Sequence, residues 1–316
     1  MPGIDFHTHL APAFDDAHSV PAGVETDDDG RLVVDGERVG MPRLYDPPAL
    51  LSTLDRLDLD AAVVSIPPPF FRPGLSAADA ATWAAAANAG LRRATDAHDR
   101  LLPLAYLPLD HPEVAVRVYE KVQADTRWAG VVGSAGGGAV SLADPAFEPL
   151  WAALDRDRRL MLLHPGSSPD ARLDEFYLSN LLGNPVETAL AAAQLVFGDV
   201  LRRFAGMRVL LVHCGGCVPS LVGRWERGLA TERPGVRVAV EPPRAALRRV
   251  FVDCLAHDPA AVDAAVGVFG ADRLVLGSDW PFPMGTDDPA ALVAHLGPDG
   301  VRRVAVDNAA AALGRK

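Results

Sequence analysis

Hydrophobic residues recur along the chain in short continuous runs, which alternate with longer stretches of helical spacing. Many runs are wholly aliphatic, such as Val209–Val212, and do not alternate between apolar and polar residues. Continuous runs are typical of strands buried on both faces, as in a parallel sheet covered by helices. The pattern predicts eight strands, at Gly3–Phe6, Ala61–Pro67, Leu101–Leu109, Trp128–Ser134, Leu160–His164, Arg208–His213, Val250–Leu255 and Arg273–Ser278.

The segments between these runs place Ala, Leu and Arg at helical spacing, which predicts a helix after most of the strands. Asp258 followed by Pro259 is typical of a helix start, with a capping side chain and a proline in the first turn. The clearest predicted helices are Ala77–His98, Pro112–Asp125, Asp144–Arg158 and Pro185–Phe204.

Eight strand–helix units in 316 residues predict an α/β fold, a (β/α)8 barrel of the TIM type. A doubly wound open sheet is the alternative. However, no Gly-x-Gly-x-x-Gly turn follows the first predicted strand, as many nucleotide-binding sheets of that class require. We therefore expect a single barrel domain over residues 1–316.

The segment from about residue 13 to residue 46 interrupts the alternation of strands and helices. It is acidic and rich in Gly and Pro, and it contains Asp35-Gly36 between apolar arms. An Asp-Gly pair in that setting predicts a β-hairpin. We expect a small β insertion after the first barrel strand.

Composition narrows the class of protein. Hydrophobic residues make up 49% of the chain, enough for a sizeable core, and the net charge is −11. That charge argues against binding to nucleic acid or to an anionic membrane surface. The chain has only three cysteines and no apolar run of about 18 residues, which argues against a disulfide framework and against a membrane span. We expect a soluble, cytoplasmic protein.

Candidate metal ligands stand at the ends of the predicted strands. His7 and His9 are two residues apart, so a strand would point both imidazoles to one side. His164 and His213 end the fifth and sixth predicted strands, and Asp279 follows the eighth. In a barrel all five side chains would meet at the carboxyl-terminal face, where barrel enzymes place their chemistry.

Imidazole nitrogens with a carboxylate suit one divalent ion, with a coordination position left for water. We expect zinc first, with manganese, iron or cobalt as alternatives. Neither of the two lysines, Lys121 and Lys316, lies at a strand end where it could bridge a second ion. We therefore expect one metal ion and no organic cofactor.

The order His7-x-His9, His164, His213 and Asp279 resembles the amidohydrolase superfamily. The likeness is closest to the group of 2-amino-3-carboxymuconate-6-semialdehyde decarboxylase and related aromatic-acid decarboxylases, and it covers nearly the whole chain. Its specific motifs are Asn184–Thr188, His213–Pro219 with Gly223-Arg224, His257–Pro259 and Leu276–Gly285.

The resemblance implies roles for these residues. His7, His9, His164 and Asp279 would be the metal ligands. His213 would be the catalytic acid and base beside a metal-bound water, with Asp279 also in the catalytic group. Arg224 would bind the substrate carboxylate from the neighbouring subunit of a homodimer.

Other residues have weaker signals. Trp280 and Phe282 either line the mouth of the site, which suits a planar substrate, or pack the last loop. His257 either orients a ligand or substrate, or helps to start the helix at Pro259. Arg43 lies in the segment where the family places substrate-binding basic residues.

Two departures from the family pattern concern the substrate pocket. Gly166 replaces a tryptophan after the His-Pro of the fifth strand, and Met41 stands where the substrate-binding arginine would align. We expect a metal-dependent, non-oxidative decarboxylase of a small conjugated or aromatic carboxylic acid. The alternative enzyme is a hydrolase or cyclase that uses the same metal hydroxide on a lactone, ester or amide bond. A catalytically inactive barrel that serves as a binding protein is the third interpretation.

Overall fold

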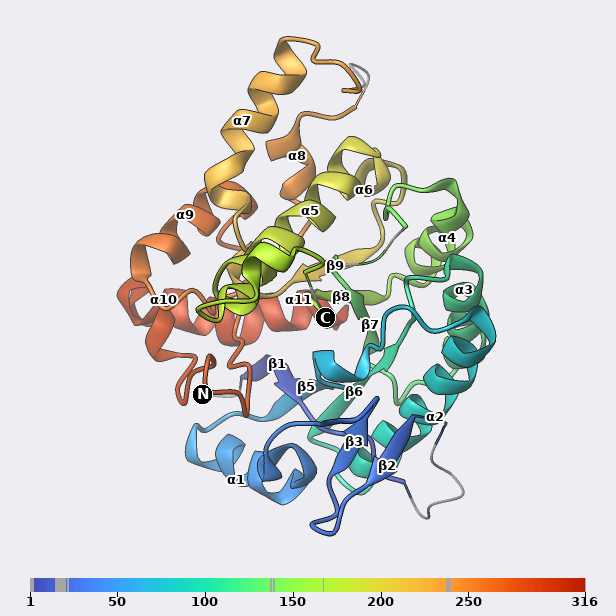
Figure 1. Ribbon diagram of the computed structural model, residues 1–316. Helices are drawn as coiled ribbons and strands as arrows, with labels where there is room; N and C mark the ends of the chain where they lie inside the picture. Colours follow the sequence, from blue (N-terminus) through green and yellow to red (C-terminus); the bar gives the residue numbers. More distant parts are fainter. Residues whose placement is uncertain are drawn as a thin grey trace.

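The computed structural model describes residues 3–14, 21, 23–136, 138, 140–166, 168–236 and 240–315. Eight parallel strands follow one another in chain order around a barrel, and helices surround them (Figure 1). Parallel bridges from Asp5 to Leu276 and from Thr8 to Trp280 join the last strand and its continuation to the first. The strands are β1 (Ile4–His9), β5 (Ala61–Ser65), β6 (Leu101–Tyr106), β7 (Gly130–Ser134), β8 (Leu160–His164), β9 (Arg208–Leu211), β10 (Phe251–Asp253) and β11 (Leu274–Val275).

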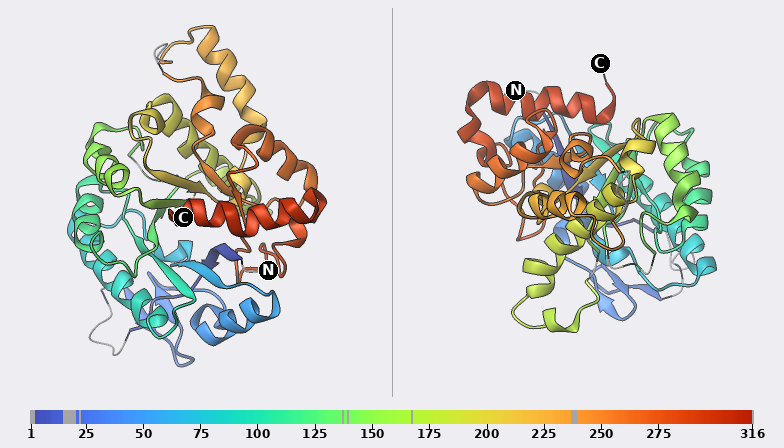
Figure 2. Two further views of the ribbon diagram at one scale, coloured as in Figure 1. Left: turned by 180° about the vertical axis from the view of Figure 1, so that it is seen from behind. Right: turned by 90° about the horizontal axis from the view of Figure 1, so that it is seen from above.

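At least one helix follows each barrel strand, which confirms the predicted (β/α)8 fold. Figure 2 shows the C-terminal helical segment, residues 297–313, crossing the barrel on the side opposite to the view of Figure 1. The helices are α1 (Pro47–Arg56), α2 (Ala77–Thr95), α3 (Pro112–Val122), α4 (Glu148–Asp157), α5 (Asn184–Phe197), α6 (Val200–Arg203), α7 (Val218–Ala230), α8 (Pro243–Leu247), α9 (Pro259–Phe269), α10 (Gly297–Arg302) and α11 (Asn308–Leu313).

The strands are apolar along their whole length because both of their faces are buried. All five residues of β5 and of β8 are buried, since one face points into the barrel and the other lies under the helices. Asp258 caps α9 by accepting a hydrogen bond from the backbone N–H of Ala260, as predicted for this helix start.

A small antiparallel sheet lies between β1 and α1. Its strands are β2 (Val24–Thr26), β3 (Leu32–Val34) and β4 (Glu37–Arg38), and Asp35-Gly36 forms the predicted hairpin turn with a positive φ at both residues. The buried guanidinium of Arg72 ties the turn to the barrel, with Nε 2.9 Å from an Asp35 carboxylate oxygen. Within the expected insertion of about 13–46, residues 15–20 and 22 lie outside the described residues.

Some element bounds differ from the prediction. The predicted helix Pro185–Phe204 is two helices, α5 and α6, because Asp199 adopts a left-handed φ of 59° after Gly198. The first strand continues to His9, so both histidines of the pair lie within β1. Among the described helices, none is both long enough and apolar enough to cross a membrane.

Candidate metal centre

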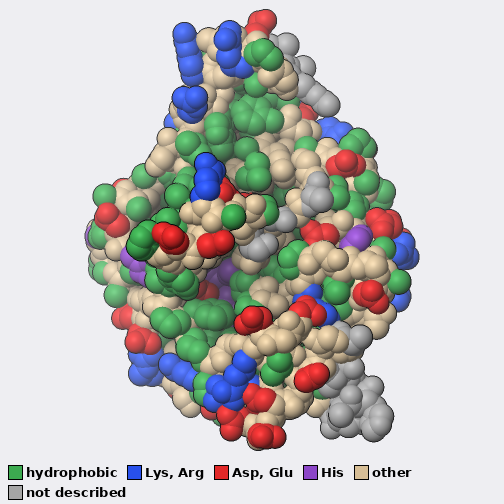
Figure 3. All heavy atoms as spheres, viewed as in Figure 1, with side chains coloured by type: hydrophobic (Ala, Val, Ile, Leu, Met, Phe, Trp, Pro, Cys, Tyr) green, Lys and Arg blue, Asp and Glu red, His purple; other side chains and the backbone are tan. Residues whose placement is uncertain are grey.

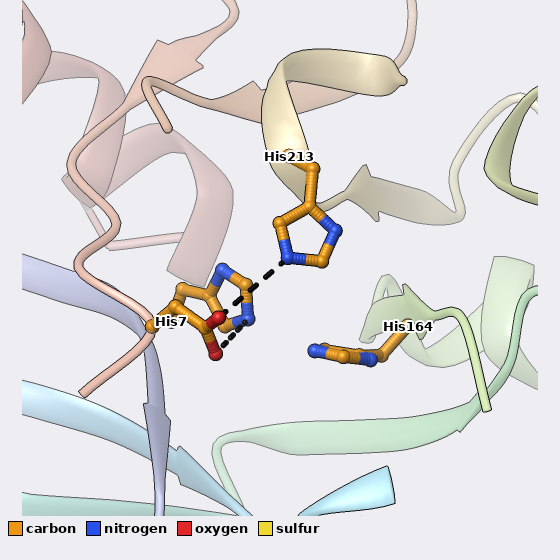
Figure 4. Close-up of side chains that lie close together, drawn as sticks. His7, His164 and His213 are labelled. Carbon is orange, nitrogen blue, oxygen red and sulfur yellow. Dashed lines mark ion pairs between the residues drawn. The ribbon is translucent and has the colours of Figure 1, made fainter. Parts of the chain in front are cut away.

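Four histidines and one aspartate, from four segments of the chain, meet at one end of the barrel. His7 and His9 belong to β1, His164 ends β8, and His213 begins the short helix η6 (His213–Gly215) after β9. Asp279 follows β11. In Figure 4 the rings of His7, His164 and His213 point toward a common centre, and the distances between their centroids are 5.0 to 5.3 Å.

Asp279 lies at the middle of this cluster. Its Oδ1 is 3.2 Å from His7 Nε2 and 3.1 Å from His9 Nε2, and its Oδ2 is 3.8 Å from His213 Nε2. Burial alone would raise the pKa of Asp279, but the charge on His7 and hydrogen bonds from the histidines hold it well below its usual value. The carboxylate is therefore ionised at neutral pH and can act as a ligand.

Three of the imidazoles have a polar contact at Nδ1, and their Nε2 atoms face the centre of the cluster. His7 Nδ1 lies 2.8 Å from a carboxylate oxygen of Asp253, and His9 Nδ1 lies 3.1 Å from the Ser65 hydroxyl. His164 Nδ1 lies 2.8 Å from the carbonyl oxygen of Pro165. Metal-binding histidines are commonly oriented by such contacts at the nitrogen that faces away from the ion.

His164 provides the test of whether a cation fits. Burial, and then the charges of the neighbouring histidines, lower its pKa well below the usual value, so the ring is neutral. A carbonyl can only accept, so Nδ1 carries the proton and Nε2 carries a lone pair. That Nε2 is buried and has no hydrogen-bond partner among the described residues. A divalent cation would satisfy this nitrogen together with the Asp279 carboxylate.

The donor atoms of His7, His164, His213 and Asp279 all lie within 4.8 Å of one another. His9 is joined to the same carboxylate at 3.1 Å and is completely buried, whereas the side chain of His213 is 20% exposed. The structure thus brings together all five residues of the predicted site. The assignment of His9 as a ligand and of His213 as the acid and base stays a prediction.

The cluster opens to solvent on the face seen in Figure 3, where histidine and acidic side chains lie at the bottom of a central hollow. His213 also lines a cavity of about 340 Å³, together with His257, Leu255 and Met284. His257 Nε2 lies 2.8 Å from the Met284 carbonyl oxygen. This contact holds the His257 ring at the cavity, outside the cluster of histidines and Asp279.

Three of the four predicted substrate-binding residues lie at or next to the site, and the fourth, Arg224, does not. The ring of Phe282 packs edge-on against His9, with 5.4 Å between centroids. The guanidinium of Arg43 lies over the buried ring of Trp280 at 5.3 Å, and these three residues line a second cavity of about 230 Å³. Arg224 is exposed on α7, and among the described residues no contact joins it to the cluster.

Gly166 lies close to the wall of the site. A Cβ atom there would be 3.0 Å from the Phe71 ring and 3.2 Å from the Ser134 hydroxyl, closer than ordinary van der Waals contact. A glycine in place of the family's tryptophan leaves this wall without a side chain. In the structure the ring of Phe71 takes part of that space and lies edge-on to His164, at 6.3 Å between centroids.

Two residues of the site were missed in the sequence. Ser65 carries no signal, because a serine at a strand end is common. Asp253 does carry one, since it is a lone acidic residue in the apolar run Phe251–Leu255 and is completely buried. An unpaired carboxylate is costly to bury, so its presence in a predicted strand indicates a partner.

Three comparisons with known proteins bear on the site. The family model described as "Amidohydrolase" matches residues 4–315. A 2-amino-3-carboxymuconate-6-semialdehyde decarboxylase of Dictyostelium discoideum is 27% identical over 307 residues, which cover 93% of this chain and 85% of that protein.

Solved structures share the fold. The 5-carboxyvanillate decarboxylase of Sphingomonas paucimobilis has a TM-score of 0.81 at 22% identity, over 100% of this chain and 99% of that one. A dihydroxybenzoic acid decarboxylase of Polaromonas sp. JS666, solved with bound manganese, has a TM-score of 0.76 at 19% identity, over 99% and 97% of the two chains.

Proposed function

This chain belongs to the amidohydrolase family, and from that premise we propose that it is a metal-dependent, non-oxidative decarboxylase of a small conjugated or aromatic carboxylic acid. The observation that carries the proposal is the unpartnered, buried Nε2 of the neutral His164, which faces the ionised Asp279. The named activity of the relative that aligns over 93% of the chain supports the choice of decarboxylation. No organic cofactor takes part in the proposed reaction.

For the metal we assign zinc, held by Nε2 of His7, His9 and His164 and by the Asp279 carboxylate. Three imidazoles with one carboxylate form a donor set that zinc favours. Manganese is the alternative, since a structural neighbour has bound manganese. When bound, the ion supplies a Lewis acid that polarises and neutralises substrate oxygen atoms.

His213 is the proposed acid and base. It is the most exposed imidazole of the cluster, and its Nε2 lies 3.8 Å from a carboxylate oxygen of Asp279. It would deliver a proton to the carbon that bears the carboxylate. The bond between that carbon and the carboxylate then breaks, its electron pair restores the conjugated system, and CO₂ leaves. General acid–base catalysis by a positioned side chain contributes about 10²–10⁴ in rate.

We propose that Arg224 binds the substrate carboxylate from a second copy of the chain. A guanidinium matches a carboxylate with two parallel hydrogen bonds. The exposure of Arg224 on α7, which projects from the barrel in Figure 1, is consistent with a role in another subunit. Arg43, Trp280 and Phe282 would line the mouth of the site, where a planar substrate can pack against Phe282.

A homodimer is also proposed. Contiguous exposed apolar side chains are unusual on monomers and mark interaction surfaces. Large hydrophobic residues are 44% to 81% exposed in and next to the first half of α5, namely Phe176, Tyr177, Leu181, Leu182, Val186 and Leu190. We further propose that residues 1–316 act as one catalytic domain, supported by the family match over 4–315. Three free cysteines support a reducing, cytoplasmic location.

The experiment that tests the activity measures CO₂ release by the purified protein loaded with Zn²⁺ or with Mn²⁺. The first substrate is 2-amino-3-carboxymuconate semialdehyde, made freshly from 3-hydroxyanthranilate. The next are 5-carboxyvanillate and 2,6-dihydroxybenzoate. The metal-free protein and the Asp279→Asn variant serve as controls. We expect metal-dependent CO₂ release from at least one of these acids.

Two results would contradict the proposal. Folded, metal-loaded protein that releases no CO₂ from any conjugated or aromatic acid would exclude decarboxylation. Products that have gained or lost water, from lactone, ester or amide substrates, would instead identify a hydrolase or cyclase with the same apparatus.

A further inference from the structure

Asp253 ends β10, is completely buried and contacts the cluster of four histidines and Asp279 through His7. Each of its two carboxylate oxygens accepts two hydrogen bonds. Oδ2 accepts from His7 Nδ1 at 2.8 Å and from the backbone N–H of His213 at 3.0 Å. Oδ1 accepts from the backbone N–H groups of Cys214 at 2.7 Å and Leu255 at 3.0 Å.

The first of these bonds fixes the state of the His7 ring. Three backbone N–H groups donate to the two oxygens of Asp253, so both oxygens act as acceptors, and the acceptor of His7 Nδ1 is one of them. His7 Nδ1 must therefore carry a proton and donate it. A cation that takes the place of the proton on Nε2 would then meet the lone pair of that nitrogen, which lies 3.2 Å from Asp279.

The next two bonds fix the backbone that carries His213. Four successive residues after β9 have positive φ values, of 53° at His213, 55° at Cys214, 76° at Gly215 and 57° at Gly216. L-residues rarely adopt this conformation, so the two non-glycine positions need support from the surrounding structure. Asp253 accepts hydrogen bonds from the backbone N–H groups of both.

We propose that Asp253 is a positioning residue for two histidines with different tasks. It holds His7 with Nε2 turned toward the cation, and it holds the left-handed turn that brings the His213 ring to Asp279. The carboxylate sits on β10, which pairs with β9 and β11, and so it connects β1 to the turn after β9. This inference rests on the proposed function only for the identity of the cation and the reaction.

The test compares two buried carboxylates. Each oxygen of Asp253 accepts two hydrogen bonds. In Asp253→Asn one oxygen is replaced by an NH₂ group, which cannot accept and would face two N–H donors. Asp5→Asn is the matched control. Asp5 is 2% exposed and lies two residues before His7. Its Oδ1 accepts from the backbone N–H groups of both His7 and Ser278, so an amide oxygen keeps both bonds. Its side-chain hydrogen bond with Ser278 involves a hydroxyl, which can also accept from an amide N–H.

We expect Asp253→Asn to weaken Zn²⁺ binding by about 10- to 100-fold, the usual effect of losing a residue that orients a ligand. Its kcat should stay low when the protein is saturated with Zn²⁺, because the turn that carries His213 has shifted. Asp5→Asn should keep the wild-type affinity for Zn²⁺ and the wild-type kcat. Equal losses in the two variants, or wild-type values in Asp253→Asn, would overturn the proposal.

A measurement on the unchanged chain covers the case in which Asp253→Asn does not fold. In protein labelled with ¹⁵N-histidine and loaded with ¹¹³Cd²⁺, His7 should show coupling of the metal to Nε2 and a slowly exchanging proton on Nδ1. Metal on Nδ1 would refute the inference. If the protein binds no metal, the proposed function fails, but the Nδ1 proton of His7 still reports its bond to Asp253, and its absence refutes the positioning role.

Discussion

At the scale of single residues, the cluster is built from polar groups whose burial costs free energy unless they form hydrogen bonds. His9 is completely inaccessible and His7 is 1% exposed, yet each has a partner at Nδ1 and lies next to Asp279 at Nε2. A buried polar group without a partner destabilises the fold, so these contacts are a condition for the cluster to form at all. His164 Nε2, like His7 Nε2 and His213 Nδ1, is buried without a hydrogen-bond partner among the described residues.

The roles of His9 and His213 can be separated by substitution. His213→Ala should lower turnover by about 10²–10⁴-fold, since a general acid is lost, while the bound metal stays nearly stoichiometric. His9→Ala should strip or weaken the bound metal, because a buried ligand is removed. Metal content by elemental analysis and CO₂ release are measured on the same samples. Loss of metal from His213→Ala would make His213 a ligand and reverse the assignment.

Sequence reasoning identified the strand-end histidines and Asp279 because each follows an apolar run. It could not identify which atoms hold these rings in place. The partners of His7, His9 and His164 are a carboxylate, a hydroxyl and a carbonyl, and two of the three belong to other strands. Such contacts depend on the pairing of strands distant in sequence, which no local pattern encodes.

At the scale of elements, His213 and Asp279 are positioned by the turns that follow β9 and β11, and not by the strands themselves. The turn after β9 is left-handed through Gly216, whose φ of 57° and ψ of −130° suit glycine. A Cβ atom at Gly216 would lie 2.4 Å from the carbonyl oxygen of Pro185. The Gly-Gly pair therefore keeps His213 close to α5 and to the cluster.

Gly216→Ala should destabilise the protein by about 1–3 kcal/mol, since both the conformation and the close contact disfavour a side chain. Gly223→Ala is the control. Gly223 lies within α7 with no atom near its Cβ position, and alanine there should stabilise by about 0.5–1 kcal/mol. Urea unfolding of the two variants gives both values. A Gly216→Ala protein as stable as the wild type would show that the turn relaxes.

At the scale of the whole molecule, barrel closure gathers residues that are up to 272 positions apart, from His7 to Asp279. Parallel strands around a closed sheet bring all their carboxyl ends to one face, so the proposed ligands from β1, β8 and the segment after β11 meet there. The proposed role of Arg224 extends beyond a single chain, and Arg224 lies on the exposed surface of α7.

Mixing two inactive variants tests whether Arg224 acts across the subunit interface. Arg224→Ala and His213→Ala should each lack activity. A mixed dimer would contain one complete site, formed by His213 of one subunit and Arg224 of the other. Random exchange of subunits should then restore about a quarter of the wild-type activity. The assay is CO₂ release after subunit exchange, with the mass of the dimer measured by light scattering. No recovery from exchanged dimers would place Arg224 in its own subunit's site.

The sequence alone determined the repeating order of strand and helix, the barrel, the strand-end histidines and the family, because apolar runs and motif spacing are local features of the chain. Tertiary structure alone decided that the partner of His7 is Asp253, that Phe71 takes space next to Gly166, and that Arg224 stays on the surface. These outcomes depend on which distant side chains the closed barrel brings within hydrogen-bond or van der Waals distance.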